Sequence, residues 1–251
     1  MLEIKNLSAG YRGTDVLKEV SLNVELGKLT ALVGRNGCGK STLLSCVNGM
    51  VDYTGDIFLN GKELRQMTAR EKAAHIAFLP QILPGTAMRV NELVSLGRNP
   101  HLAFLGKMSR SDMEICERAM SETGIAEFCE KKVCELSGGE RQRAFIAMIL
   151  AQDTEIIMLD EPTTYMDVGN RAEFFRLLQS LRDRSGKTVL AVVHDLPEAV
   201  RYCDRMVVLD GGRVMFDGSA ADCLTDGVLE RTFGVKAHTF DDNGAIYTVF
   251  E

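Results

Sequence analysis

The sequence predicts an α/β fold in which a mostly parallel sheet is interrupted by a helical insert, and three observations lead to this prediction. The apolar run Leu29–Val33 ends abruptly in a glycine-rich loop, and a helical segment follows. Between about Leu83 and Ile149, strand patterns nearly vanish and apolar residues recur at helical spacing. From Ile156 onward, short apolar strands alternate with helical segments again. A core with one inserted lobe also suits a chain of 251 residues.

The expected strands are short runs of apolar and β-branched residues bounded by turn signals. Asn60-Gly61 is a strong turn signal after one of them, and Pro80 closes another. The tail from His238 predicts a small hairpin that turns at Asp242-Asn243-Gly244. In chain order, the expected strands are Leu2–Leu7, Val16–Val24, Leu29–Val33, Asp56–Leu59, His75–Leu79, Ile156–Leu159, Thr188–Val193, Arg205–Leu209 and Gly212–Phe216.

The expected helices show apolar residues at a period of about 3.6 residues. Ser109 followed by Asp112 is a typical helix start, because a serine side chain caps the free N–H groups of the first turn. The expected helices are Met108–Thr123, Gly139–Gln152, Gly169–Asp183 and Pro197–Tyr202.

The composition narrows the classes of protein. Hydrophobic residues make up 45% and charged residues 25%, which is typical of a soluble globular protein and argues against disorder. No apolar run approaches the roughly 18 residues of a membrane-spanning helix, and the first ten residues do not resemble a secretory signal. A net charge of -6 disfavours a nucleic-acid binder that works by general charge attraction. Seven scattered cysteines without a CxxC pair predict reduced cytosolic thiols.

The glycine-rich loop fits the pattern GxxxxGK[ST] between a predicted strand and a predicted helix, which is the context that this motif requires. Its backbone N–H groups would point inward as an anion-binding nest, and the following helix adds the positive end of its dipole. Lys40 would reach the β- and γ-phosphates of a nucleotide, and the Ser41 hydroxyl would bind Mg²⁺. The expected nucleotide-binding residues here are Gly34, Arg35, Asn36, Gly37, Cys38, Gly39, Lys40, Ser41 and Thr42.

Cys38 leaves two alternatives open. An oxidation switch at the phosphate loop is one, since a reactive thiol there would control nucleotide binding. The other is that Cys38 contributes only its backbone N–H while its side chain points elsewhere.

Two carboxylates follow the apolar strand Ile156–Leu159. Ligands gather at the carboxyl ends of parallel strands, so Asp160 and Glu161 are expected to face the phosphate loop. Asp160 suits an Mg²⁺-organising role, and Glu161 has the position of a general base that polarises the attacking water.

The segment Leu136–Arg143, with the sequence LSGGERQR, is the most specific motif in the chain. Ser137, Gly138 and Gly139 at a helix start form a second potential anion site, made of a hydroxyl, exposed N–H groups and the helix dipole. This motif resembles the signature sequence of ATP-binding cassette (ABC) ATPases, and the resemblance extends over nearly all of the chain.

The resemblance implies the fold and its division. It implies a P-loop NTPase core of the ABC ATPase type with an antiparallel β subdomain and an inserted helical subdomain. Residues 1–82 and 147–251 would form the nucleotide-binding core with the β subdomain, and residues 83–146 the helical signature subdomain.

The resemblance also implies a homodimer. In the family, each signature faces the phosphate loop of the other subunit, so a head-to-tail C2 dimer sandwiches two ATP molecules with Mg²⁺. That arrangement explains why one chain carries two anion sites.

Other residues match family positions. Gln81 matches the glutamine that contacts Mg²⁺ and the attacking water, and His194 matches the histidine that holds the γ-phosphate and orients Glu161. Tyr11 matches the aromatic residue that stacks on adenine. Asp167 matches the aspartate of the loop across the dimer interface, although methionine precedes it where leucine is usual. For His75, His101 and His238, a structural hydrogen bond to the backbone is the expected role.

Local features resemble one group of importers in particular. They are the segment Val90–His101, the run Glu140–Ala144 and the turn Glu161–Thr164, and the group imports siderophores, haem and cobalamin. The chain would then power a metal-chelate importer as a peripheral protein on the cytoplasmic side of the cell membrane. Its partners would be integral membrane permease subunits and, indirectly, an extracellular or periplasmic substrate-binding protein, with no nucleic acid.

In the family, the membrane subunit docks into a groove just after Gln81. The side chains of Leu83, Val90 and Leu93 could line this groove, and packing in the core is an equally weighted alternative for each. Two other functions remain open from the sequence. A soluble ABC ATPase without a transporter, such as an iron–sulfur assembly factor, is one. A P-loop kinase is the other, although it leaves the segment Leu136–Glu140 unexplained.

Overall fold

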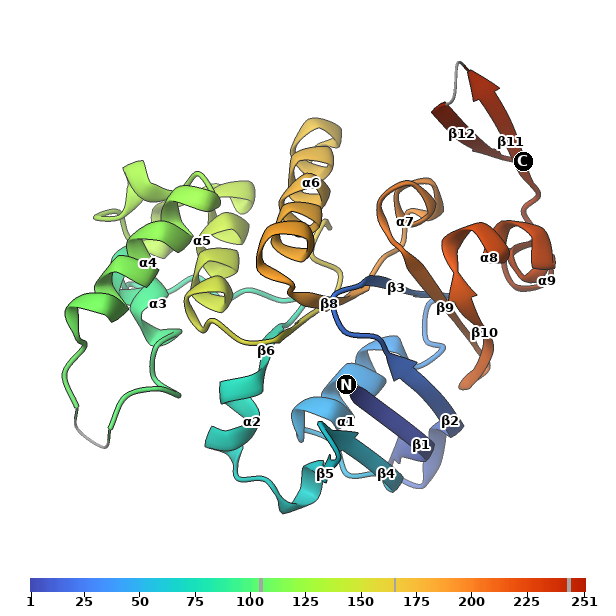
Figure 1. Cartoon of the computed structure of the whole chain (residues 1–251), viewed down its shortest axis with the longest axis horizontal. Coiled ribbons are helices and arrows are strands. Elements are labelled where there is room, and N and C mark those ends of the chain that lie inside the picture. Colours follow the sequence, from blue (N-terminus) through green and yellow to red (C-terminus); the bar gives the residue numbers. More distant parts are fainter. Residues whose placement is uncertain (104–105, 165, 243–244) are drawn as a thin grey trace. The chain divides into compact units, whose positions relative to one another are not determined.

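The computed structural model describes residues 1–103, 106–164, 166–242 and 245–251 (Figure 1). These residues form two compact units. The first combines Met1–Met67 with Thr188–Glu251, and the second is Thr68–Lys187. The predicted fold class is confirmed, since the chain is mixed α/β and contains both antiparallel and parallel sheets. The expected separation of a helical subdomain at residues 83–146 stays a prediction.

One sheet of the first unit is antiparallel, with the strand order β2-β1-β4-β5. Its register sets Leu2 of β1 opposite Val24 of β2 and Leu59 of β4. All three side chains are buried, so this face packs against the core of the unit. The strands are β1 (Leu2–Tyr11), β2 (Thr14–Val24), β4 (Thr54–Leu59) and β5 (Lys62–Glu63).

The second sheet of the first unit holds the functional loop. Its central strand is β3 (Leu29–Gly34), which pairs in parallel with β8 (Thr188–Val192) and β9 (Arg205–Asp210). β10 (Arg213–Ser219) pairs antiparallel with β9. All residues of β3 and β8 are buried, which is typical of parallel strands covered on both faces.

Helices follow the strands of this unit. α1 (Lys40–Asn48) follows β3 directly, as expected, and α7 (Leu196–Tyr202) lies between β8 and β9 in the chain. Two further helices, α8 (Ala220–Asp226) and α9 (Val228–Phe233), were not predicted. With seven and six residues, they show little helical period, and neither opens with a proline as α7 does.

The chain ends in the predicted hairpin. β11 (Ala237–Asp242) pairs antiparallel with β12 (Ala245–Phe250). The predicted turn residues Asn243 and Gly244 lie outside the described residues.

The second unit contains a parallel pair, β6 (Ile76–Leu79) and β7 (Ile156–Leu159), in which Leu79 lies opposite Leu159. β6 begins one residue later than predicted, because His75 ends α2 (Ala69–His75). Thr68 and Glu71 start this helix with a capping box. The sequence did not reveal α2 because the helix has no buried residue and therefore no apolar period.

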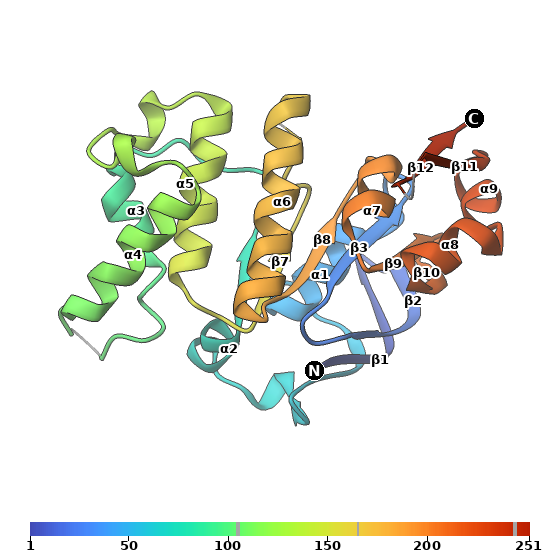
Figure 2. The ribbon, with the colours of Figure 1, turned by 45° about the horizontal axis from the view of Figure 1, so that its top comes forward.

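Four helices complete the second unit: α3 (Val90–Leu96), α4 (Arg110–Glu122), α5 (Gly138–Ala151) and α6 (Val168–Ser185). α3, α4 and α5 pack against one another, and both views show them as one group (Figures 1 and 2). Val90 and Leu93 of α3 are buried in this group. Their burial supports the core-packing alternative over a role in lining a permease groove. Among the helices that the structure describes, none is both long and apolar enough to cross a membrane.

A buried ion pair ties these helices together. The Arg98 side chain follows α3 and donates from Nε to Asp112 Oδ1 at 2.9 Å and from Nη1 to the carbonyl of Ala151 at 2.7 Å. Asp112 also accepts from the backbone N–H and the hydroxyl of Ser109, at 2.9 and 2.6 Å. Gly97 permits the backbone after α3 to lie close to α5, since a Cβ there would lie 2.2 Å from the Met148 carbonyl oxygen. The predicted start of α4 at Ser109 is confirmed.

The ion pair predicts a pH-dependent contribution to stability. The Ser109 and Arg98 hydrogen bonds lower the pKa of Asp112 to about 2 from its ordinary value of 3.8. A carboxylate with a lowered pKa stabilises the fold above the unfolded value and loses that effect as the pH falls through the folded value. Asp112→Asn should therefore lower the melting temperature by a constant amount above about pH 5. The difference should shrink from about pH 4 downward.

Thermal unfolding followed by circular dichroism from pH 7 to pH 3 measures this difference. The matched control is Glu117→Gln on the exposed face of the same helix, which should leave the melting temperature within about 1 °C. An Asp112→Asn deficit that stays constant down to pH 3 would contradict the assignment.

Candidate functional site

The phosphate loop joins β3 to α1 in the first unit. Gly37 and Gly39 have φ angles of 78° and 110°, which glycine adopts without strain, and they turn the chain into the helix. Lys40 opens α1, and its side chain curls back under the loop. Its Nζ donates to the carbonyl oxygens of Gly34 at 2.8 Å and Arg35 at 3.1 Å. Only 5% of Lys40 is exposed, so the loop is wrapped around a buried cation.

Gly34 is required where β3 ends. A Cβ at this position would lie 2.2 Å from the carbonyl oxygen of Leu209 and 2.6 Å from Cys38 Sγ. The backbone of the neighbouring strand β9 therefore permits no side chain here. Gly34 thus allows the chain to leave the sheet while its carbonyl still reaches Lys40.

The Cys38 side chain points into the protein rather than outward. It is 6% exposed, and its Sγ lies 3.9 Å from Lys40 Nζ. Burial raises the pKa of the Cys38 thiol, and the nearby Lys40 ammonium offsets this effect only in part. A thiol held in its neutral form is a poor nucleophile, so this environment favours the backbone alternative over the oxidation switch.

In the second unit, the ends of β6 and β7 bring Gln81 and Glu161 together. The backbone N–H of Asp160 donates to the Leu79 carbonyl at 2.9 Å, which extends the parallel pairing by one residue. Beyond it, Gln81 Nε2 donates to Glu161 Oε2. Asp160 is only 6% exposed. Gln81 and Glu161 thus meet at the carboxyl ends of β6 and β7, and the expectation that Asp160 and Glu161 face the phosphate loop stays a prediction.

Glu161 has a backbone φ of 50°, in the left-handed region that few residues other than glycine adopt. Its carbonyl accepts from the Thr164 hydroxyl at 3.0 Å, and Thr164 also reaches Glu161 Oε2 at 3.4 Å. Strained backbone of this kind persists where the surroundings hold it, and it is enriched at active sites.

The signature segment forms the start of α5. Ser137 is the N-cap residue and accepts from the backbone N–H of Glu140 at 3.3 Å, while Glu140 accepts from the backbone N–H of Ser137 at 2.7 Å. Hydrogen bonds from Ser137 lower the pKa of Glu140, so this capping box stays charged. Ser137 and Gly138 are exposed, which leaves the helix start accessible to an anion.

Sequence reasoning missed Gln142, which links the signature helix to the loop of Glu161. Its Nε2 donates to the carbonyl oxygen of Pro162 at 2.6 Å, and the side chain is 2% exposed. The signal in the sequence is a polar residue two positions before the apolar run that starts at Ala144 of α5. A glutamine at a buried helical position needs a buried partner, and this one holds the residue after the proposed base.

A second link runs along the backbone. The N–H groups of Val133 and Cys134 donate to the carbonyls of Met88 and Thr86 at 2.9 and 3.0 Å. The segment that follows Gln81 is therefore paired with the segment that leads into Ser137.

The remaining predicted residues have the following places. Tyr11 ends β1 and is 52% exposed, as a stacking platform requires. His194 follows β8 and is exposed. Asp167 caps α6, where its two carboxylate oxygens each accept a 2.8 Å hydrogen bond from Asn170. Tyr165, two positions earlier, lies outside the described residues.

Of the three histidines expected to form a structural hydrogen bond with the backbone, His101 does so. His101 Nε2 lies 2.7 Å from the Gln152 carbonyl oxygen. His75 and His238 instead lie 3.9 and 3.5 Å from the carboxylates of Glu155 and Glu251.

The predicted residues divide between the two units. Tyr11, the phosphate loop and His194 belong to the first, whereas Gln81, Asp160, Glu161 and Ser137–Gly139 belong to the second. Within each unit the local geometry agrees with the expected roles, and the roles themselves stay predictions.

The residues expected to bind Mg²⁺ belong to both units, with Ser41 in the first and Asp160 and Gln81 in the second. Each carries an oxygen donor, the ligand type that Mg²⁺ prefers, and a shared ion site stays a prediction. Among the described residues, no group of three or more His, Cys, Asp or Glu side chains could hold a metal ion.

The packing at Gly34 predicts the effect of one added methyl group. Gly34→Ala should weaken ATP binding at least about tenfold, because its Cβ forces the loop away from β9 and moves the carbonyl that holds Lys40. Fluorescence titration with an ATP analogue measures this affinity.

Gly169→Ala is the matched control, since its Cβ would meet only Asp167 Oδ1 at an ordinary contact of 3.5 Å. It should bind the analogue as the unchanged protein does. Unchanged affinity in Gly34→Ala would show that the loop does not depend on this close approach.

Comparisons with known proteins cover most of the chain. The family model described as ABC transporter matches residues 17–164. The iron(3+)-hydroxamate import ATP-binding protein FhuC of Bacillus subtilis is 39% identical, with 96% of this chain and 90% of the relative covered. The ferric enterobactin transport ATP-binding protein FepC of Escherichia coli is 37% identical, with 95% and 89% covered.

Solved structures agree with these relatives. A protein described as a metal-chelate type ABC transporter, in an inward-facing conformation, gives a TM-score of 0.85 at 25% identity, with 100% of this chain and 96% of that chain covered. A dimeric ATP-binding cassette in a post-hydrolysis state, bound to ADP and Pi, gives 0.78 at 26% identity, with 88% and 99% covered. With the phosphate loop and the capped signature helix, these likenesses show that the chain belongs to the ABC transporter family.

Proposed function

We propose that this chain is the ATP-binding and ATP-hydrolysing subunit of an importer for a metal chelate, such as an iron siderophore, haem or cobalamin. The observation that carries nucleotide binding is the phosphate loop, in which Lys40 is buried against the carbonyls of Gly34 and Arg35. The metal-chelate class is supported by relatives that are named for the import of ferric hydroxamate and ferric enterobactin.

ATP would bind along the phosphate loop. The N–H groups of residues 35–42 and the start of α1 supply positive potential, and the Lys40 ammonium needs only to exchange its carbonyl contacts for phosphate oxygens. The exposed ring of Tyr11 would stack on adenine. Bound Mg²⁺ would neutralise charge on the phosphates, and Ser41, Asp160 and Gln81 are the residues to hold it.

Hydrolysis would use the Glu161 carboxylate as a general base. A water molecule attacks the γ-phosphorus as Glu161 takes its proton, and the bond to the β–γ bridging oxygen breaks to give ADP and phosphate. Gln81 already contacts Glu161 and would help to position the water. His194 would hold the γ-phosphate and orient Glu161.

A homodimer would complete each site. Ser137, Gly138 and Gly139 of one subunit would bind the γ-phosphate held by the loop of the other, with Asp167 at the interface. The exposed start of α5 supports this arrangement, and a dimeric cassette is among the structural neighbours.

The remaining partners would be integral membrane permease subunits, reached from the cytoplasmic side of the membrane, and through them an extracellular or periplasmic binding protein. Ile82 directly follows Gln81 and is 77% exposed, so it is a better candidate for a permease contact than the buried Val90 and Leu93. A permease that binds this exposed apolar side chain would contact the chain next to Gln81, the residue proposed to position the water, and would so couple its docking to ATP hydrolysis.

The alternative of a soluble iron–sulfur assembly factor is not favoured, because the similar proteins are import and transport ATP-binding proteins.

Substitution of the proposed base predicts a trapped dimer. Glu161→Gln keeps the shape of the side chain and removes the base, so ATP should bind and remain unhydrolysed. With Mg-ATP, gel filtration coupled to light scattering should show a dimer, and phosphate release should fall at least about a hundredfold.

Lys40→Ala is the control, since it should bind ATP poorly and remain monomeric under the same conditions. A monomer in both variants would argue against the ATP-sandwiched dimer. Unchanged phosphate release in Lys40→Ala would argue against the phosphate loop.

The proposed permease contact predicts a second result. When the chain is co-expressed with its permease, it should sediment with membranes. Ile82→Asp should release it to the supernatant, because a charge replaces an apolar contact. Met50→Asp is the control, at a side chain that is 68% exposed elsewhere on the surface.

The complex purified with its external binding protein should retain a metal chelate, which mass spectrometry identifies. A metal-free cargo would overturn the chelate assignment and leave the ATPase assignment standing.

A further inference from the structure

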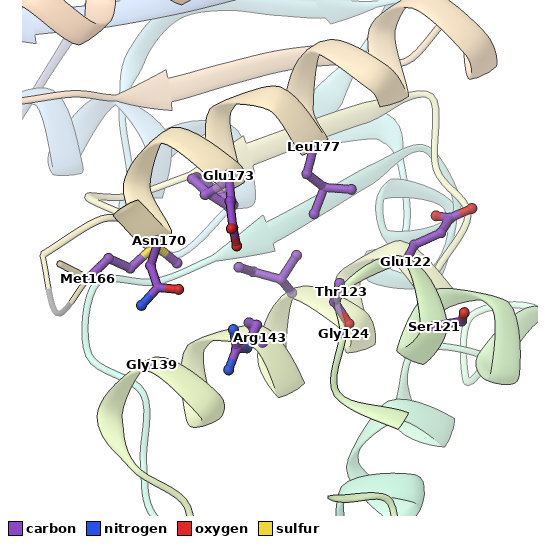
Figure 3. A pocket seen from close by; sticks show the side chains of 12 residues that line it. Ser121, Glu122, Thr123, Gly124, Gly139, Arg143, Met166, Asn170, Glu173 and Leu177 are labelled. Atoms are coloured by element: carbon purple, nitrogen blue, oxygen red, sulfur yellow. The ribbon is translucent and has the colours of Figure 1, made fainter. Parts of the chain in front are cut away.

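The second unit contains a cavity of about 260 Å³, and among its lining residues only Gly139 has a proposed role. It lies between α5, α6 and the end of α4 (Figure 3). Side chains reach it from both sides, since Asn170, Glu173 and Leu177 project from α6 and Arg143 projects from α5.

The cavity has one apolar wall. Ile146 of α5 and Phe174 of α6 are 2% and 5% exposed, and Met166, just before α6, is 7% exposed. Leu177 continues this surface one turn further along α6. A ligand that fits must therefore bring an apolar body.

The polar groups carry charges of both signs. Arg143 lines the cavity, and its Nε is buried without a hydrogen-bond partner among the described residues. The guanidinium of Arg143 thus keeps donor groups that no described residue uses, and a carboxylate in the cavity can accept from them. Glu122 and Glu173 lie at the rim, where both are exposed. Within the described chain, no hydrogen bond or ion pair joins Arg143 to either carboxylate.

Charge complementarity selects a zwitterion. A ligand with only a carboxylate would satisfy Arg143 but would be repelled by Glu122 and Glu173. A ligand with only an ammonium group would leave Arg143 Nε unpaired and would face its positive charge. A molecule that carries both groups next to an apolar chain matches the guanidinium, the rim carboxylates and the apolar wall together.

We propose that this cavity, formed by Arg143, Glu173, Ile146, Met166, Phe174 and Leu177, binds a hydrophobic α-amino acid. The carboxylate pairs with Arg143, the ammonium group pairs with Glu173, and the side chain packs on Ile146 and Phe174. The volume lies just below the roughly 300–1,000 Å³ of sites for drug-sized ligands, which suits a smaller molecule of this kind.

The site is placed to report on the ATPase cycle. Gly139 of the signature lines it, and Met166 directly precedes Asp167. A bound ligand would hold α5 and α6 at one spacing. Any effect on ATP turnover rests on the proposed function, whereas binding itself does not.

L-leucine is the probe, and isothermal titration of the full chain without nucleotide measures its binding. We expect saturable binding with one site and a Kd of about 1 mM or lower. 4-Methylpentanoate lacks the ammonium group and 3-methylbutylamine lacks the carboxylate, so each should bind at least about tenfold more weakly.

Variants locate the site. Glu173→Gln and Arg143→Gln should each weaken leucine binding at least about tenfold. Glu117→Gln, an exposed carboxylate on α4 outside the cavity, should leave it unchanged. Glu173 is exposed, so its replacement keeps the test valid even if Arg143→Gln fails to fold.

Three results would overturn the proposal. They are an absence of saturable leucine binding up to about 20 mM in protein that still binds Mg-ATP, equal binding of either half-ligand, and leucine binding that Glu173→Gln leaves unchanged. Loss of Mg-ATP binding in the unsubstituted protein would instead count against the proposed function.

Discussion

Two functional loops, the phosphate loop and the loop of Glu161, each start where a fully buried parallel strand ends, and this constraint sets their geometry. The strands β3 and β7 are buried at every residue, and apart from Thr30 all their side chains are apolar. The polar groups therefore emerge together at the strand ends. Lys40 returns to the carbonyl of Gly34, and Asp160 extends the pairing of β7 with β6 before Glu161 leaves it.

Where a local structure is set by a few neighbouring residues, the sequence alone was sufficient to predict it. The glycine positions of the phosphate loop, the carboxylates after Ile156–Leu159 and the serine caps at Ser109 and Ser137 all occupy the predicted local structure. These features are set by backbone conformation within a few residues, so no distant partner is needed to recognise them.

α2 was missed because it buries no side chain and so shows no apolar period, and only its local capping box of Thr68 and Glu71 marks it. Features that depend on distant partners were not predictable from local sequence patterns. Val90 and Leu93 fit either a groove or a core, and only the packing of α3 on α5 decides for the core. Gln142 likewise looks like one polar residue among several until its contact with Pro162 is seen.

The residues after Ser137–Gly139 continue in helix α5, and the helix gives neighbouring signature residues different partners. Successive helical positions point in different directions, so Gln142 reaches the Pro162 carbonyl while Arg143 reaches the cavity beside α6. The backbone pairing of residues 86–88 with residues 133–134 ties the segment after Gln81 to the same helix start. Hydrogen bonds therefore join the segment after Gln81 to the start of α5, and α5 to the loop of Glu161, so that a displacement of one strains its contacts with the next.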